Sequence, residues 1–429
     1  MPMTDLSALI DHHAAVRQAS EALTAPLSAA ECQVQSMPDA SPVKWHLAHV
    51  TWFFETFVLE PHEPGFRPHH PAFRVLFNSY YNGVGDQHPR PQRGLVTRPD
   101  LPAVLAYRAE VDRRVQALLR RGPAPEVVAL VELGLQHEQQ HQELILTDVQ
   151  HLLSCNPLDP AYRERAVQPS RPAAGLQWCR FDGGAVDIGH AGPGFAFDNE
   201  RPRHRVWLRP YELADRLVTQ GEWAAFIADG GYDDPRWWLS AGWDWLRAQR
   251  VRAPLYWRLD APGRWSRFTL AGRQPLDEGA PVCHVSLYEA DAYARWHASK
   301  QSGCAPSRLP TEAEWEHAAS MQGDAALAAG SFADRGLFEP QPAAGANGGL
   351  RQMMGEAWQW TSSAYAPYPG FHAWDGAVGE YNAKFMVNQY VLRGGSCASP
   401  RSHLRCSYRN FFPAEMRWQF CGVRLARDA

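Results

Sequence analysis

The sequence lacks the marks of a membrane-bound or exported protein. No apolar run in its 429 residues approaches the ~18 residues that a membrane-spanning helix needs. The first residues do not combine a basic stretch with an apolar stretch, as a signal peptide does. A net charge of −4 and a pI near 6.5 favour neither nucleic acid nor an anionic membrane as a partner. We therefore expect a cytoplasmic protein that binds no nucleic acid and no membrane.

The eight cysteines form no C-x-x-C pair, which argues against a zinc ribbon and against a thioredoxin-type redox motif. In a reducing compartment most of them should be free thiols. Internal repeats and low-complexity tracts are also absent. In contrast, 17 tryptophans and 33 glycines are present and concentrate in the second half, which indicates two domains of different architecture.

Residues 1–155 predict helices, because apolar side chains recur there at helical spacing. The predicted helices span residues 5–24, 42–60, 100–121 and 125–153, which fits an antiparallel four-helix bundle. Ser41 is the expected N-cap of the second helix, with Pro42 at its first helical position. Segment 61–99 is long and irregular, and a loop of that length is usually functional.

Residues 156–176 contain several prolines and are predicted to be a linker. From residue 177 to 429, short β-like runs such as 186–188 and 205–208 alternate with predicted helices at 219–228 and 286–299. A third helix is expected to begin at Thr311, with Glu314 closing a capping box. The chain is therefore expected to be an α+β protein, with a helical domain over 1–155 and a mixed domain over 177–429.

His137 and His141 form the first candidate metal site. Residues four apart share one face of a helix, so both imidazoles can reach one ion. The letters match the H-E-x-x-H pattern through Glu138, but no later ligand of that protease pattern follows. Two surface histidines are the alternative. His46 and His49 in the second helix support a metal site, because facing helices of a bundle can supply a further ligand.

The spacing alone leaves open which of His46 and His49 points inward, and the other would lie at the helix boundary or at the surface. It also leaves the ion open. Zinc would keep one open position for a water molecule, whereas iron would keep three for two substrates and oxygen. Imidazole suits both ions.

Several blocks resemble the sulfoxide synthases of ergothioneine biosynthesis, including their close selenoneine synthase branch. These blocks are residues 41–49 (SPVKWHLAH), 76–81 (LFNSYY), 88–94 (HPRPQRG), 137–143 (HEQQHQE), 384–396 (KFMVNQYVLRGGS) and 408–412 (YRNFF). The resemblance covers nearly the whole chain. It implies a DinB-like four-helix bundle followed by a formylglycine-generating-enzyme-like domain of the C-type-lectin kind.

The resemblance also implies a function. The family joins sulfur to C2 of the imidazole of hercynine, the trimethylated betaine of histidine, with Fe(II) and O₂. The implied iron ligands are His49, His137 and His141, which leaves His46 outside the ligand set. Gln140 resembles the glutamine that hydrogen-bonds the substrate imidazole. The co-substrate stays open between a thiol (cysteine or γ-glutamylcysteine) and a selenosugar.

Five further residues are candidates for catalysis or substrate binding. Tyr80 and Tyr81 can deliver a proton or an electron during the reaction, and the resemblance puts one of them beside the iron. The alternative is a buried aromatic pair. Trp418 matches the family position that holds a quaternary ammonium group, although a tryptophan in such a domain is more often core. Arg90 and Arg93 can pair with a substrate carboxylate, or they are solvated loop charges.

Other functions remain as alternatives. One is a zinc-dependent DinB-type thiol transferase, and another is a lectin-like ligand-binding protein with a structural bundle. A copper-binding formylglycine-generating enzyme fits less well, because Cys397 and Cys406 are nine apart and the histidines would have no role. Cys406 and Cys421 are either inert core thiols or marks of the selenium branch.

Overall fold

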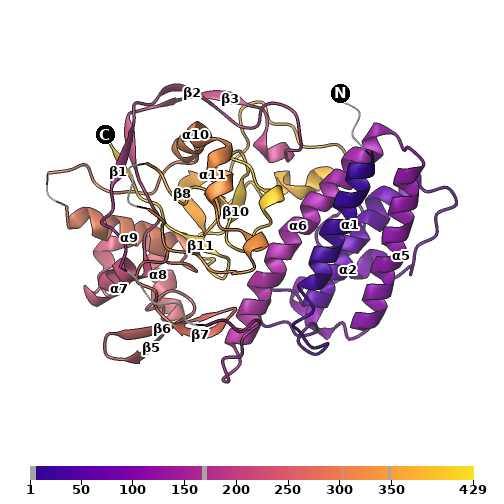
Figure 1. Cartoon of the computed structure of the whole chain (residues 1–429), viewed down its shortest axis with the longest axis horizontal. Coiled ribbons are helices and arrows are strands. Elements are labelled where there is room, and N and C mark those ends of the chain that lie inside the picture. Colours follow the sequence, from indigo (N-terminus) through magenta and orange to yellow (C-terminus); the bar gives the residue numbers. More distant parts are fainter. Residues whose placement is uncertain (1–5, 167–171, 302, 346–348) are drawn as a thin grey trace. The chain divides into compact units, whose positions relative to one another are not determined.

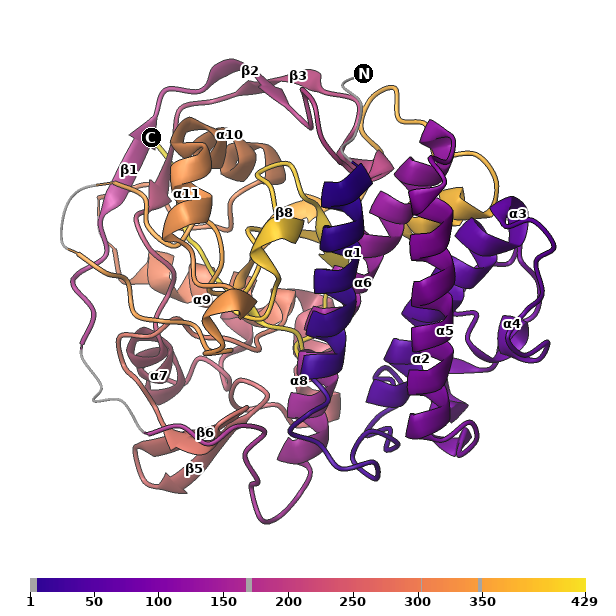
Figure 2. The same ribbon diagram turned by 45° about the vertical axis from the view of Figure 1, so that its right-hand side comes forward.

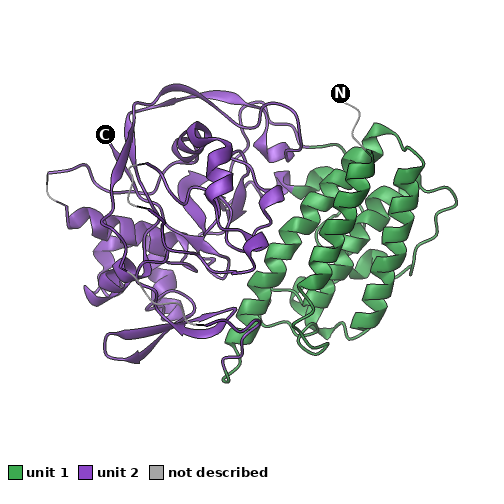
Figure 3. Cartoon of the chain, viewed as in Figure 1, with its two compact units in different colours: residues 1–158, 374–381 green, residues 159–373, 382–429 purple. Residues whose placement is uncertain are grey.

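The computed structural model describes residues 6–166, 172–301, 303–345 and 349–429. The chain forms two compact units (Figure 3). Unit 1 comprises Met1–Leu158 and Trp374–Tyr381, and unit 2 comprises Asp159–Ala373 and Asn382–Ala429. None of the helices in the described ranges combines the length and the apolar character that crossing a membrane requires.

Unit 1 is the predicted helical bundle. Its helices are α1 (Leu6–Ala22), α2 (Val43–Phe53), α3 (Glu60–His62), α4 (Phe73–Leu76), α5 (Leu101–Arg120) and α6 (Pro125–Ser154). The four long helices α1, α2, α5 and α6 run side by side in Figures 1 and 2, with α1 and α2 both packed against α5 and α6. A π-helical turn (Phe54–Leu59) connects α2 to α3, and a 3₁₀ helix spans Arg90–Leu95. The expected α+β class with an N-terminal bundle is confirmed.

The predicted start of the second helix is wrong by one residue. Pro42 is the N-cap residue, α2 begins at Val43, and no side chain caps it. Ser41 has other partners, because its amide donates to Asp148 Oδ2 (2.8 Å) and its hydroxyl accepts from Arg93 Nη1 (2.9 Å). The Ser41 amide thus connects the start of α2 to α6, and the hydroxyl that sequence reasoning assigned to capping binds the 3₁₀ helix.

A glycine sets how closely α2 and α6 approach. Gly134 lies in α6, and a Cβ atom there would come within 2.6 Å of the Phe54 ring. That distance is well inside van der Waals contact, so a larger residue would require the Phe54 ring or the helices to shift. Gly134 precedes His137 by about one turn, and the close approach therefore occurs next to the candidate metal site.

A buried ion network lies in the bundle beside α6. The Glu138 carboxylate accepts from Arg17 Nη1 (2.7 Å), Arg108 Nη2 (2.8 Å) and Ser20 Oγ (2.6 Å). Burial alone would raise the pKa of Glu138, but the two guanidinium groups outweigh it and lower the pKa to about 2. Glu138 is thus committed to the packing of α1, α5 and α6, and it is not a free base of the zinc-protease kind.

Eight residues from the second half of the chain belong to unit 1. In the segment Trp374–Tyr381, the Glu380 carboxylate accepts from the amides of Asn82 (3.0 Å) and Gly83 (2.6 Å). The Tyr381 hydroxyl donates to Gln140 Oε1 in α6. This segment therefore adds side chains to the bundle that no pattern in residues 1–155 predicts.

Unit 2 is the predicted mixed domain. Its strands are β1 (Trp178–Phe181), β2 (Gly184–Ile188), β3 (His204–Leu208), β4 (Tyr211–Ala214), β5 (Trp257–Ala261), β6 (Arg264–Thr269), β7 (Gly272–Pro275), β8 (Trp358–Ala364), β9 (Tyr390–Arg393), β10 (Asn410–Phe412), β11 (Cys421–Gly422) and β12 (Ala426–Asp428). They form sheets in the orders β1-β4-β12, β10-β9-β8-β11, β2-β3 and β5-β6-β7. All pairs are antiparallel except β8 with β11.

Three of the five helices that the structure describes in unit 2 begin within one residue of their predicted starts. They are α7 (Gln220–Ala228), α8 (Ser240–Gln249), α9 (Leu287–Ser299), α10 (Glu312–Gln322) and α11 (Asp324–Ala329). Thr311 caps α10, and the Glu314 carboxylate accepts from the Thr311 amide (2.8 Å), so the predicted capping box is present. Sequence reasoning predicted α7, α9 and α10 but did not predict α8 or α11.

Tryptophans fill the core of unit 2 because each buried indole finds an acceptor. Trp315 Nε1 donates to Gln359 Oε1 (2.8 Å), and Trp360 Nε1 donates to the Val285 carbonyl (2.8 Å). Gln359 also accepts from Arg424, whose buried guanidinium donates to the Ala214 carbonyl (2.6 Å). The Gly- and Trp-rich composition of the second half is thus structural.

Part of the predicted linker 156–176 packs on unit 2. Asp159 forms ion pairs with Arg273 (2.9 Å) and Arg258 (3.2 Å), and the Tyr162 amide donates to the Leu270 carbonyl (2.9 Å). Residues 167–171 of the linker lie outside the described residues.

Glu138→Gln should destabilise unit 1 by about 3–5 kcal/mol, because it leaves two buried guanidinium groups without their carboxylate. Chemical denaturation of the metal-free protein, followed by far-ultraviolet circular dichroism, measures the loss. Asp187→Asn is the matched control, since it breaks an exposed ion pair with Arg205 and should cost less than about 1 kcal/mol. Equal stability of Glu138→Gln and wild type would contradict the network's role.

Candidate metal centre

Three histidines of unit 1 come together in one small volume. His49 comes from α2, and His137 and His141 come from one face of α6. One ring nitrogen of each lies within 4.8 Å of those of the other two. Among the described residues, this is the group of three or more His, Cys, Asp or Glu side chains whose geometry suits a metal ion.

Ring nitrogens of two of these histidines, His49 and His137, are buried without a protein partner. His49 Nδ1 donates to the Phe77 carbonyl (2.6 Å), which leaves His49 Nε2 buried without a hydrogen bond. Both ring nitrogens of His137 are also buried without one. An unsatisfied buried polar atom costs about 1–3 kcal/mol. A metal ion would satisfy these atoms, so the three residues fit a metal.

Burial keeps the three imidazoles neutral, as metal ligation requires. It lowers the pKa of His137 to about 3 and holds the pKa of His49 and His141 well below the usual value. Repulsion among the imidazoles lowers the pKa of His49 and His141 further, each being disfavoured by a charged His137. No protonated histidine therefore blocks the site at neutral pH.

Aromatic rings enclose the cluster. Trp45 and Trp52 both stack on His49, with ring centroids 4.7 Å and 5.6 Å from that of His49. The Phe53 ring lies 4.9 Å from that of His137. These side chains restrict the rotation of the imidazoles and exclude water from this side of the cluster.

One interpretation of the sequence placed His46 at the surface, but the structure buries it. Its side chain is 3% exposed, and His46 Nδ1 lies 2.8 Å from His141 Nδ1. His46 points at a candidate ligand instead of at the space between the three ligands. The reason is its position in α2. His46 precedes His49 by three residues, which turns its side chain by about 300° around the helix axis relative to that of His49.

Gln140 and a tyrosine from the second half lie beside the cluster. Gln140 accepts a hydrogen bond from Tyr381, whose ring centroid lies 5.5 Å from that of His137. Sequence reasoning did not predict Tyr381. Nothing in the local sequence marks it, because its position depends on packing against residues about 240 positions earlier in the chain.

Tyr80 and Tyr81 form a stacked pair in unit 1. Their ring centroids are 4.6 Å apart, and the Tyr80 ring lies 6.5 Å from that of Tyr381. Tyr81 is fully buried against Trp52 and Phe57. Burial raises the pKa of both phenols, so both stay protonated at neutral pH and can donate a proton.

Arg93 differs from Arg90. The Arg93 guanidinium is buried and lies 3.4 Å from the centroid of the Trp45 ring, whereas Arg90 is exposed and donates to the Asp39 carbonyl. Burial, followed by repulsion from Arg90, lowers the pKa of Arg93 to about 8. Arg93 Nη1 donates to Ser41 Oγ (2.9 Å), and the buried Nε of Arg93 has no partner. Arg93 is therefore suited to bind an anion.

Trp418 belongs to unit 2. It is 7% exposed, its ring packs against Phe412 at 5.6 Å, and its carbonyl lies 3.2 Å from His284 Nδ1. Of the three C-terminal cysteines, Cys397 and Cys421 are buried, and burial raises the pKa of Cys406 and Cys421. All three are free thiols, and such surroundings make a thiol unreactive.

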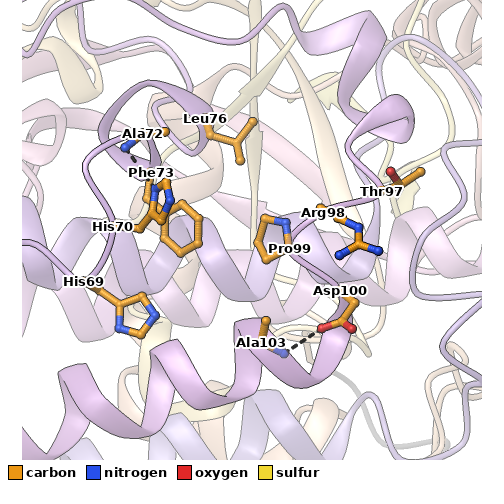
Figure 4. Close-up of a pocket in the computed structure, with 10 residues that line it drawn as sticks. All are labelled: His69, His70, Ala72, Phe73, Leu76, Thr97, Arg98, Pro99, Asp100 and Ala103. Carbon is orange, nitrogen blue, oxygen red and sulfur yellow. Dashed lines mark hydrogen bonds between the residues drawn. The ribbon is translucent and has the colours of Figure 1, made fainter.

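A second hollow in unit 1 has no comparable set of ligands. It encloses about 940 Å³ between α4 and the start of α5 (Figure 4). His69 is already paired with Glu110 (2.6 Å), and Asp100 accepts from the Ala103 amide (2.9 Å) as the cap of α5. The three-histidine cluster is therefore the better candidate for a functional centre.

Comparison with known proteins gives the family. The chain is 36% identical to the hercynine oxygenase of Mycolicibacterium thermoresistibile, over 93% of this chain and 90% of that protein. It is 33% identical to the hercynine oxygenase of Mycobacterium tuberculosis, over 93% and 94%. This chain belongs to the hercynine oxygenase family. Residues 12–145 match the DinB superfamily, and residues 166–429 match the sulfatase-modifying factor enzyme 1-like domain.

A more distant relative is also informative. Ergothioneine biosynthesis protein 1 of Schizosaccharomyces pombe is 26% identical over 54% of this chain and 28% of that protein. The two family matches of this chain lie in the expected order. A DinB-like bundle comes first, and a formylglycine-generating-enzyme-like domain follows it.

Replacing His49, His137 or His141 by Ala should abolish tight metal binding, because each change removes one of three ligands. Metal content after loading with Fe(II) and desalting under anaerobic conditions measures it. His46→Ala should weaken binding far less. The assignment would be wrong if His46→Ala lost the metal and His49→Ala kept it.

The metal-free protein should lose stability as the pH falls below about 6.5, the usual pKa of histidine. The unfolded chain takes up protons there, whereas the folded chain does not until the pH approaches the lowered pKa of about 3 of His137. His137→Phe should therefore flatten the fall by about 1 kcal/mol per pH unit between pH 4 and 6. Urea denaturation across this range tests it, and an unchanged slope would refute it.

Proposed function

We propose that this chain is an Fe(II)- and O₂-dependent enzyme that joins sulfur or selenium to C2 of the imidazole of hercynine. The observation that carries the proposal is the cluster of His49, His137 and His141, whose rings are neutral and in which His49 and His137 have buried nitrogens without a partner. The names of the relatives supply the substrate. When bound, Fe(II) would supply the redox chemistry with O₂ that closed-shell zinc does not provide.

The overall reaction with a thiol balances as a four-electron oxidation. Hercynine loses the hydrogen at C2, the thiol loses its hydrogen, and a carbon–sulfur bond forms. The sulfur then carries one oxygen atom as a sulfoxide, and the second oxygen atom leaves as water with the two hydrogens. The protein must therefore hold hercynine and the thiol together and deliver protons at the right moment.

The residues beside the cluster suit these tasks. The amide of Gln140 can hydrogen-bond the substrate imidazole once the substrate replaces the Tyr381 hydroxyl as its partner. Arg93, with Arg90 next to it, can bind the carboxylate of hercynine or of the co-substrate. Trp418 is our candidate for the trimethylammonium group, through cation–π attraction. Tyr381 and Tyr80 are the candidate proton donors, because the Tyr381 ring lies 5.5 Å from that of His137 and the Tyr80 ring lies 6.5 Å from that of Tyr381, while Tyr81 packs against the core.

An oxygen-uptake assay with product analysis tests the proposal. Iron-loaded protein is supplied with hercynine together with cysteine, γ-glutamylcysteine or a selenosugar, and products are identified by mass spectrometry. The proposal expects O₂ consumption that needs both substrates. Zinc as the bound metal with no O₂ consumption would favour a DinB-type thiol transferase. Tight hercynine binding without turnover with any donor would favour a lectin-like binding protein.

Tyr381→Phe should keep iron and hercynine binding but slow coupling by about 10²-fold or more, because a positioned proton donor contributes that much. Oxidation of the sulfur or selenium co-substrate alone should increase, because this side reaction then competes better with the slowed coupling step. Tyr81→Phe is the matched control, because Tyr81 is fully buried and packs against Trp52 and Phe57. Tyr80→Phe reports whether the neighbouring phenol shares the role. Unchanged rates and product ratios in all three variants would rule out these tyrosines as the proton donor.

A further inference from the structure

His46 connects a candidate ligand to a buried carboxylate. His46 Nδ1 lies 2.8 Å from His141 Nδ1, and His46 Nε2 lies 3.0 Å from Asp148 Oδ2. The same carboxylate oxygen accepts from the Ser41 amide (2.8 Å). His46 and Asp148 are 3% and 6% exposed. A continuous chain of hydrogen bonds thus runs from a backbone amide to His141, entirely inside unit 1.

The chemistry of these groups fixes the position of each proton. A carboxylate only accepts, so the proton at the contact with Asp148 belongs to His46 Nε2. A neutral imidazole carries one proton, which makes His46 Nδ1 an acceptor. The proton between the two imidazoles then belongs to His141 Nδ1. The free nitrogen of His141 is therefore Nε2.

We propose that His46 is a positioning residue, which with Asp148 holds His141 in the one tautomer and orientation that offer Nε2 to the metal. Without this acceptor, the proton of His141 could move to Nε2 and the ring could rotate. Either change would remove a ligand atom from the site until it was reversed.

The surroundings of another candidate ligand, His49, set this arrangement apart from ordinary core packing. His49 is held in the same way, since its Nδ1 donates to the Phe77 carbonyl (2.6 Å). A histidine that merely filled the core would need partners, but it would not need to direct its acceptor nitrogen at a ligand's donor. Groups that orient a metal-bound histidine typically change metal affinity by about 10–100-fold when they are removed.

This inference rests on the proposed metal site but not on the proposed substrates. Its test is therefore metal binding. An anaerobic titration with Co(II) measures this binding, because the visible absorption of bound Co(II) reports the ligand geometry. Wild type that binds no Co(II) would reject the metal site itself. If wild type binds Co(II) and the His46 variants bind it equally well, only the role of His46 would be rejected.

The variants separate the hydrogen bond from the bulk of the side chain. His46→Phe keeps a flat ring but removes the acceptor, and it should raise the Kd for Co(II) by about 10–100-fold. His46→Asn places an amide oxygen near the position of Nδ1, and it should recover most of the lost affinity. His151→Phe is the matched control, because His151 lies in the same helix and pairs with Ser36 (2.8 Å), and its Kd should equal that of wild type.

Nitrogen-15 NMR of the histidine rings measures the tautomer directly in the metal-free protein, with the His141 signals identified by their loss in His141→Ala. Wild type should show His141 protonated at Nδ1 alone, and His46→Phe should show a mixture of both tautomers. A Kd in His46→Phe equal to that of wild type would overturn the inference. So would His141 protonated at Nε2 in wild type, a result that needs no folded variant of His46.

Discussion

Three imidazoles share one small volume of the bundle, and burial opposes the protonation of each. Among the described residues, Nε2 of His49 and both ring nitrogens of His137 have no hydrogen-bond partner, and aromatic side chains pack around them. Such a set is costly for the protein to keep empty, because unsatisfied buried groups and mutual repulsion both destabilise it. The rest of unit 1 can be understood as what holds these rings together at a fixed spacing.

The backbone provides that spacing through two helix faces. His137 and His141 occupy the face of α6 that also carries Gly134, and the missing side chain of Gly134 lets α2 approach with His49. On another face of the same helix, Glu138 ties α6 to α1 and α5 through Arg17 and Arg108. The letters H-E-x-x-H thus carry two separate tasks, with ligands on one face and a structural ion network on the other.

The fold and the His137–His141 pair of the candidate site could be predicted from the sequence because their signals are local, whereas the choice of His49 over His46 came from the family resemblance. Apolar spacing gave the helices, the Thr311 capping box gave the start of α10, and the spacing of His137 and His141 indicated a shared ion. The start of α2 was misjudged, because the tertiary contacts of Ser41 with Asp148 and Arg93 replace the cap that its side chain could form. The contact of His46 with His141 spans 95 positions, and that of Tyr381 with Gln140 spans 241. No local pattern encodes such distances, so these contacts became visible only in the folded chain.

The central claim is that His49, His137 and His141 bind one Fe(II) ion. X-ray absorption spectroscopy of the iron-loaded protein tests it most directly, because the fine structure at the iron edge distinguishes imidazole nitrogen from sulfur and oxygen ligands. The account predicts one iron per chain, with the scattering pattern of three imidazoles and no sulfur. Iron bound through cysteine sulfur, or an imidazole pattern that survives intact in His137→Ala, would contradict it.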